Sequence, residues 1–166
     1  PENDKTAVKW YTLAAEQGVD YAQYQLGIMY ADGRGVPEND KTAVKWYIKA
    51  AEQGYAHAQI NLGHMYANGE GVPENDKTAV KWYTLAAKQG HALAKGQYYL
   101  GTMYANGEGV LTDNWRAYMW WNLGSYNGDE LAGENKDKIA KQMTPADISK
   151  AQDMSSRCLE SNYTDC

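Results

Sequence analysis

The chain has 166 residues, of which 43% are hydrophobic and 22% charged, and its formal net charge is −5. This composition is typical of a folded domain, and no stretch is long and apolar enough to span a bilayer. The acidic balance, with lysines that recur singly, argues against a surface that follows phosphates. We therefore expect neither a nucleic-acid partner nor membrane insertion.

One string of eleven residues, PENDKTAVKWY, occurs three times without change and starts at Pro1, Pro37 and Pro73. The starts are 36 residues apart, a period typical of helical repeat arrays. Because the chain begins in mid-repeat and lacks an initial Met, we expect it to be a piece of a longer protein.

The first repeat predicts two antiparallel helices. Apolar residues recur at helical spacing from about residue 4 to 17, and Gly18 ends this helix. A second apolar stripe contains Leu26 and Gly27, and the glycines at 33 and 35 end it. The second repeat copies this pattern, whereas the third has two extra residues, which we expect to lengthen the turn at 91–95.

Glycine follows leucine at the same place in three repeats, at positions 27, 63 and 101. A glycine there allows neighbouring helices to approach closely, and large rings on the partner helix would fill the layer between repeats. By periodicity we expect those rings to include Trp10, Trp46 and Trp82.

A fourth, degenerate copy begins near residue 111 and keeps the helical pattern to about Ser125. A more polar helix follows at about 129–142. Thr144, Pro145 and Asp147 then form a strong helix start, since they supply an N-cap hydroxyl, a proline in the first turn and an acid at N3. We predict repeats over residues 1–127 and a capping segment with a cysteine-containing tail over 128–166.

The repeats resemble the Sel1-like repeat family, which is related to the tetratricopeptide repeats. The resemblance is carried by Ala-x-x-x-Leu-Gly-x-x-Tyr, then Gly-x-Gly-Val-Pro, then Ala-x-x-Trp-Tyr-x-x-Ala-Ala-x-x-Gly, as in residues 22–54 and 58–90. It implies an all-α, right-handed superhelical solenoid of antiparallel helix pairs, with the Leu-Gly helices on the concave side. It also implies a bacterial, non-enzymatic scaffold or adaptor that binds a protein or peptide and needs no cofactor.

The differences between the first two repeats fall at only ten of 36 positions, and three of them share one face of the Leu-Gly helix. We predict a binding patch in the groove that contains these three positions in each of the three repeats, together with the position one turn further on. Neutral drift at solvent-exposed positions is the alternative explanation. The candidate groove residues are Tyr21, Tyr24, Ile28, Asp32, His57, Ile60, His64, Asn68, Lys95, Tyr98, Thr102 and Asn106.

Other chemistries find little support in the sequence. His57 and His64 are seven residues apart, about 10.5 Å along a helix, which is too far to share one metal ion. His91 stands alone in a loop, and no nucleophile motif or phosphate loop is present. Envelope carbohydrate or peptidoglycan binding or processing remains a second interpretation, because tyrosine and tryptophan rings also stack on sugars.

Cys158 and Cys166 are the only cysteines, and they lie near the end of the last predicted helix and at the last residue. A turn after residue 160 would allow a disulfide that pins the tail; two free thiols are the alternative. A disulfide favours an oxidising compartment, so we expect a periplasmic or secreted protein. The sequence leaves the oligomeric state open.

Overall fold

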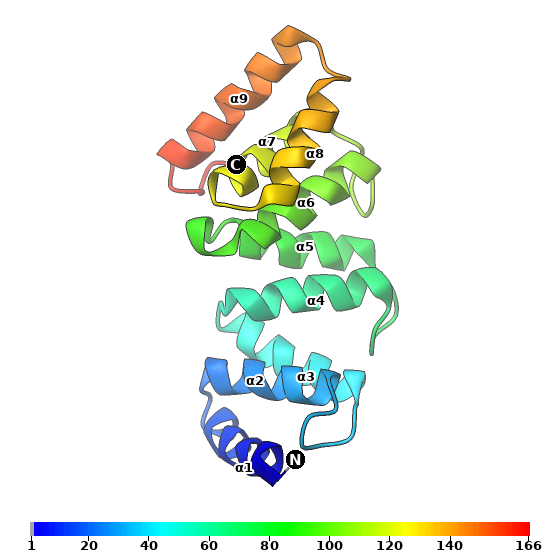
Figure 1. Cartoon of the computed structure of the whole chain (residues 1–166), viewed down its shortest axis with the longest axis vertical. Helices are drawn as coiled ribbons and strands as arrows, with labels where there is room; N and C mark the ends of the chain where they lie inside the picture. The colour runs from blue at the N-terminus through cyan, green and yellow to red at the C-terminus, as the bar shows by residue number, and fades with distance from the viewer. Residues whose placement is uncertain (1) are drawn as a thin grey trace. The chain divides into compact units, whose positions relative to one another are not determined.

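The computed structural model describes residues 2–166, except for the side chains at 2, 91 and 92, so the His91 side chain lies outside the described set. Over this range the chain forms nine α-helices and one 3₁₀ helix and contains no strand (Figure 1). It divides into two compact units, Pro1–Asn75 and Asp76–Cys166. The predicted all-α fold of antiparallel helix pairs is confirmed.

The first unit contains four helices that pack in chain order, each on the next. Their starts and stops follow local chemistry: the Asn39 side chain accepts a hydrogen bond from Thr42 N at 2.9 Å, and Gly18 and Gly54 turn the chain with positive φ. The helices are α1 Glu2–Glu16, α2 Asp20–Ala31, α3 Asp40–Glu52 and α4 Ala56–Asn68.

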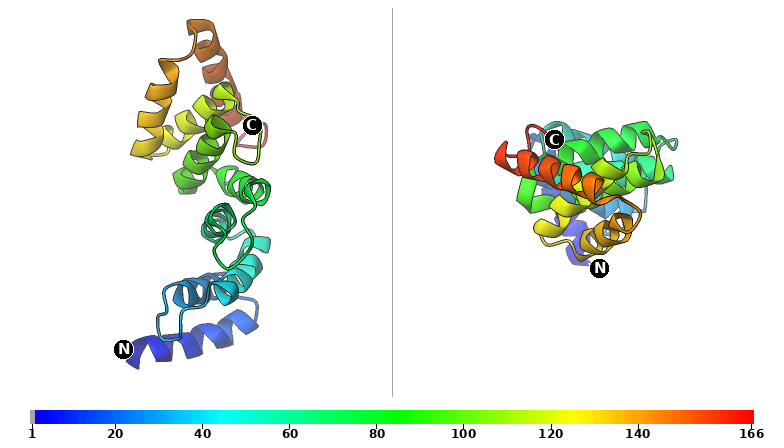
Figure 2. Two further views of the ribbon diagram at one scale, coloured as in Figure 1. Left: turned by 90° about the vertical axis from the view of Figure 1, so that its right-hand side faces the viewer. Right: turned by 90° about the horizontal axis from the view of Figure 1, so that it is seen from above.

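In the second unit, α5 packs on α6 and α6 on α7, while α8 and α9 both pack on α7 (Figure 2). The insertion in the third repeat falls where the sequence predicts it, in the 3₁₀ helix η1 before α6. The elements are α5 Asp76–Ala87, η1 Gly90–Leu93, α6 Ala94–Asn106, α7 Asn114–Tyr126, α8 Glu130–Ala140 and α9 Pro145–Glu160.

Contacts between the Leu-Gly glycines and aromatic rings hold successive repeats together in both units. A Cβ atom on Gly27 of α2 would overlap the buried ring of Tyr47 from α3. A Cβ atom on Gly101 of α6 would lie 2.7 Å from Cδ1 of Trp121, the α7 residue that replaces tyrosine in the degenerate copy. The predicted role of these two glycines in close helix packing therefore agrees with the structure.

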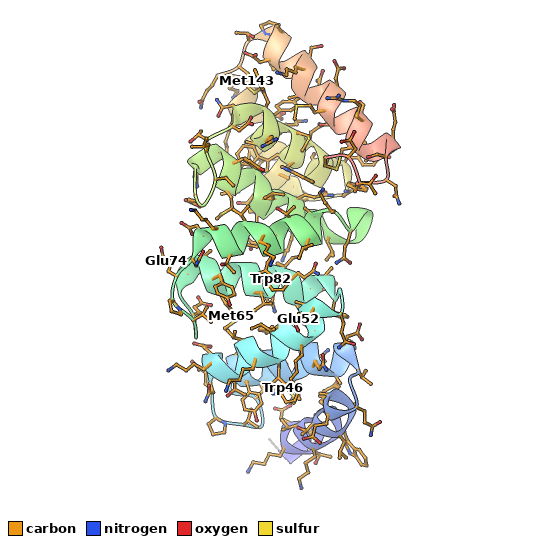
Figure 3. The ribbon with its side chains drawn as sticks, turned by 180° about the vertical axis from the view of Figure 1, so that it is seen from behind. Trp46, Glu52, Met65, Glu74, Trp82 and Met143 are labelled. Carbon is orange, nitrogen blue, oxygen red and sulfur yellow. A yellow bond between two sulfur atoms is a disulfide. The ribbon has the colours of Figure 1, made fainter. Side chains whose placement is uncertain are left out.

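The predicted burial of the tryptophans between repeats is wrong for Trp10, which is 68% exposed. Trp46 and Trp82, both labelled in Figure 3, are half-buried. Trp46 packs against the core of the first unit, and Lys49 Nζ lies 4.3 Å from its ring centroid. Consecutive helical residues point about 100° apart, and Tyr47 is the one of the two that is buried against Gly27. The tyrosine occupies the layer and the tryptophan lies at its edge.

Buried glutamines form a second link that the sequence analysis did not identify. Gln23, Gln59 and Gln97 each donate from Nε2 to a carbonyl near the end of the preceding long helix, at Ala15, Ala51 and Ala87, over 3.1–3.2 Å. The free oxygens of two of them accept hydrogen bonds at 2.8 Å, Gln23 from Gln53 and Gln97 from Asn127. Each donor belongs to the C-cap residue of the following repeat.

The chain turns back after α9, and the structure joins Cys158 to Cys166, the pair expected from the sequence, in a disulfide (Figure 1). Tyr163, with φ of 64°, is buried in this loop against Gly90, where a Cβ atom would lie 2.9 Å from its ring. Asn127 Nδ2 donates to the Tyr163 hydroxyl at 2.9 Å. The tail is thus anchored on the third repeat.

Replacing Gly27 with alanine tests the close contact in the first unit. Alanine favours a helix by about 1 kcal/mol over glycine, yet the new methyl group would force the Tyr47 ring to move within a packed layer. We expect Gly27→Ala to destabilise the fold by about 1–3 kcal/mol, with a melting temperature roughly 2–12 °C lower in circular dichroism.

Gly133→Ala in α8 is the matched control. A Cβ atom there meets only the side chain of Ser125, with Oγ at 2.9 Å, and a hydroxyl can rotate away. We expect an unchanged or raised melting temperature. Equal effects of the two substitutions would show that helix propensity, and not the ring contact, decides the outcome.

The capping box of α9 predicts a pH dependence of stability. Hydrogen bonds from Thr144 and from Trp115 Nε1 hold the pKa of Asp147 below its ordinary 3.8. Because the folded-state pKa is lowered, the ionised carboxylate stabilises the fold above pH 3.8, and this contribution disappears as the pH falls through the lowered value. We expect Asp147→Asn to melt below the parent at neutral pH, with a gap that closes in acid, in melting curves followed by circular dichroism. A gap that stays the same in acid would contradict this prediction.

Candidate peptide-binding surface

Six aromatic side chains of the first unit form a connected ring cluster on the side of α2 and α4 that carries the variable residues. Tyr24 lies at its centre, with its ring centroid 4.9 Å from Tyr55, 5.9 Å from His57 and 6.0 Å from Tyr47. Tyr21 joins the margin, 6.4 Å from Tyr55. The members of the ring cluster are Tyr11, Tyr21, Tyr24, Tyr47, Tyr55 and His57.

The ring cluster is buried on one side and open on the other. Tyr47 is buried, Tyr24 and Tyr55 are half-buried, Tyr21 is 47% exposed and His57 is also exposed. Burial is the main cause that raises the pKa values of Tyr24, Tyr47 and Tyr55. The phenols therefore remain neutral at physiological pH and can donate hydrogen bonds to a partner.

An acidic pocket of about 300 Å³ lies at the C-terminal ends of the same two helices. The lining includes carboxylates of Asp32, Asp40 and Glu70, and no Lys or Arg side chain belongs to it. Glu70 accepts a hydrogen bond from Asn68 Nδ2 at 3.3 Å and lies 3.5 Å from His64 Nδ1. The lining residues of the acidic pocket are Ala31, Asp32, Asp40, Tyr47, Asn61, His64, Met65 and Glu70.

Tyr47 connects the ring cluster to the acidic pocket, since it lines the pocket and its ring contacts Tyr24. Burial raises the pKa of the Tyr47 phenol most, a hydrogen bond with Asn61 partly offsets this, and Tyr24 and then the negative charges of Asp32 and Asp40 raise it further. The two features form one surface along α2 and α4, apolar and aromatic at one end and acidic at the other.

Six of the eight predicted groove residues of the first unit lie in the ring cluster or at the acidic pocket, and Ile28 and Ile60 lie in neither. Tyr21, Tyr24 and His57 are in the ring cluster, Asp32 and His64 line the acidic pocket, and Asn68 binds Glu70 at its rim. Ile28 is half-buried on the same helix. Ile60 was expected to face the groove, but it is 8% exposed and belongs to the core.

The four predicted residues of the second unit form a smaller group. Tyr98 is half-buried, its ring 5.2 Å from Tyr99, and Thr102 donates to the Tyr98 carbonyl at 3.1 Å. Lys95 and Asn106 are exposed, and Asn106 donates to Glu108 at 3.0 Å. A single patch that runs across three repeats stays a prediction.

Sequence reasoning missed three members of the ring cluster. Tyr11 and Tyr47 belong to the string that repeats without change, so a search among the differing positions discards them. Tyr55 does differ from its counterpart, Val19, but it precedes the helix and lies off the face that the i, i+3, i+7 spacing selects. The difference between Val19 and Tyr55 was the signal in the sequence that could have identified Tyr55.

The described residues contain no group of three or more His, Cys, Asp or Glu side chains placed to hold a metal ion. Among the described helices, none combines the length and apolarity needed to cross a bilayer.

Helix pairs that repeat every 36–38 residues, packed through glycine and aromatic side chains, define an α-helical repeat protein. Four segments match the Sel1 repeat family model, residues 1–19, 20–55, 56–91 and 94–129, and the chain belongs to that family. Sel1 repeats commonly mediate protein–protein interactions and are in general not catalytic. A comparison with curated proteins finds no match.

Solved structures with this fold include bacterial proteins. The chain is 34% identical to c5321, a protective antigen of uropathogenic Escherichia coli strains with an SLR fold, at a TM-score of 0.85 over 94% of this chain and 34% of the antigen. It is 36% identical to a Sel1 repeat protein from Oxalobacter formigenes, at a TM-score of 0.75 over 89% and 61%. Helicobacter pylori cysteine-rich protein B is 22% identical and shares the fold, at a TM-score of 0.61 over 80% and 93%. The chain thus spans about a third of the antigen and less than two thirds of the Oxalobacter protein.

Proposed function

We propose that this chain is a non-enzymatic scaffold that binds a peptide segment of a partner protein along α2 and α4 of the first unit. The observation that carries the proposal is the ring cluster, in which half-buried and exposed rings gather around Tyr24, which also contacts the buried Tyr47. Tyrosine rings supply large contact areas with little loss of rotamer entropy, and aromatic residues are enriched at binding hot spots.

The family and the local packing support this proposal. Sel1 repeats commonly bind proteins, and the exposed members of the ring cluster, Tyr21 and His57, are at positions where the first two repeats differ. Neutral drift at solvent-exposed positions rarely produces a contiguous set of partly exposed tyrosines, because nothing in drift favours neighbouring aromatic rings. The groove residues of the second unit, Lys95, Tyr98, Thr102 and Asn106, are proposed to extend the binding surface of the array.

We propose an oxidising location, in the periplasm or outside the cell. The disulfide between Cys158 and Cys166 supports it, as does the likeness to a cysteine-rich protein of the same fold. We also propose that residues 128–166 cap the repeats, since α8 and α9 both pack on α7 of the last copy.

Panning a random peptide library against the whole chain tests peptide binding. We expect selected peptides, made synthetically with a fluorophore, to bind the parent chain with saturable polarisation. Tyr21→Ser combined with His57→Ser removes two exposed rings without opening the core, so affinity should fall about tenfold while the circular dichroism spectrum stays unchanged.

Leu13→Ser combined with Tyr126→Ser is the control, because these side chains are 51% and 66% exposed and lie outside the ring cluster. The proposal is wrong if no peptide is selected or if both double variants weaken binding equally. A change in tryptophan fluorescence on adding muropeptides, with no peptide selected, would favour the carbohydrate interpretation.

Removing the disulfide tests the anchored tail. For so short a loop we expect Cys158→Ser with Cys166→Ser to cost about 2–3 kcal/mol, and reduced parent chain should melt at the same lowered temperature. The parent chain, denatured without reductant, should take up no alkylating agent by intact mass. Two alkylated thiols in natively produced protein would contradict the disulfide and remove its support for the proposed location.

A further inference from the structure

We propose that the partner segment is basic: one Arg or Lys side chain enters the acidic pocket, and an adjacent apolar or aromatic side chain packs on the ring cluster. This inference rests on the proposed peptide binding and adds to it the chemistry of the partner.

The charge of the acidic pocket defines the first requirement. Asp32, Asp40 and Glu70 come from the end of α2, the start of α3 and the turn after α4, so three separate elements contribute an acidic residue to the lining of one cavity. The lining offers one histidine and no Lys or Arg to balance them. A cationic side chain from a partner supplies the missing charge.

The walls of the acidic pocket suit the shape of such a side chain. Ala31, Met65 and the ring of Tyr47 give it apolar sides, against which the methylene stem of Lys or Arg can pack while its charged head reaches the carboxylates. A guanidinium can also stack on the tyrosine and bind a carboxylate through two nitrogens. A small anion would be repelled by the carboxylates, and an uncharged sugar would leave their charge unbalanced.

Negative charge reaches the ring cluster from both ends of α2. Burial and then Tyr21 raise the pKa of Tyr55, and Asp20 at the start of α2 adds to them. Asp32, just after α2, and Asp40, at the start of α3, act in the same direction on Tyr47. Aromatic faces beside carboxylates attract a cation more strongly than either group alone. The surface is therefore complementary to a segment in which basic and aromatic or aliphatic residues alternate.

The repeats themselves supply substitutions that the fold accepts. Asn68 and Asn106 stand at the position of Asp32 in the next two repeats, so Asp32→Asn copies a residue already present there. Glu70 is exposed, and glutamine keeps its length and its hydrogen-bond acceptor. The Asp32→Asn, Glu70→Gln variant therefore removes two charges from the acidic pocket with little change of shape.

The test uses the whole chain and the same random peptide library. We expect Arg and Lys to be enriched in peptides selected on the parent chain, and this enrichment to be lost on the pocket variant. For one selected peptide, the pocket variant should bind about five- to tenfold more weakly in fluorescence polarisation. A peptide with norleucine in place of the basic residue should bind the parent chain more weakly, by the same factor that the pocket variant loses. The parent chain and the pocket variant should then bind this peptide with the same affinity.

Glu16→Gln combined with Glu52→Gln is the control, since it removes the same number of charges at exposed helix ends outside the acidic pocket. Figure 3 labels Glu52 and the pocket residue Met65. The inference is wrong if the selected peptides are not enriched in Arg and Lys, or if the control variant loses as much affinity as the pocket variant. Either result would leave the proposed peptide binding intact. Selection of no peptide would instead overturn the proposed function. If the double variant loses its helical circular dichroism spectrum, the single variant Asp32→Asn replaces it in the test. We expect this variant to bind the selected peptide about threefold more weakly.

Discussion

The close contact between a Leu-Gly glycine and the ring of the next long helix is the constraint on which each unit depends. Gly27 brings α2 against α3, and Gly101 brings α6 against α7. Without a side chain on the glycine, the ring lies directly on the helix backbone and fills the layer between repeats. The spacing of the pairs, and with it the place of every surface residue, follows from this contact.

Hydrogen bonds then fix how successive repeats are aligned, which the packing of rings alone does not determine. Gln23 and Gln97 are buried, and each bonds a helix-end carbonyl of its own repeat and a C-cap side chain of the following one. A buried amide without these partners would be costly, so the helix ends cannot slide without breaking hydrogen bonds. The ring contact thus sets the distance between repeats, and the glutamines set their alignment.

The sequence alone was sufficient for the helix pairs, the capping box at Thr144 and the family, because these depend on local spacing that repeats. It could not place Trp10 or Ile60, since periodicity shows which residues share a helix face but not which neighbour covers it. The acidic pocket was also out of reach. Its carboxylates at 32, 40 and 70 come from three elements, and Asp40 belongs to the unchanged string, so only the folded chain brings them together.

In the folded chain, constant residues contribute to the candidate binding surface as well as to the packing between repeats. Tyr47 is constant, and it packs on Gly27, contacts Tyr24 and lines the acidic pocket at once. A constant ring that holds the repeats together therefore also forms the floor of the surface on which Tyr21, Asp32, His57 and His64 differ. Because the floor is fixed by the stacking of repeats, a few substitutions around it can change the preferred partner without disturbing the fold. Repeat arrays of this kind can acquire new ligands while their packing residues stay the same.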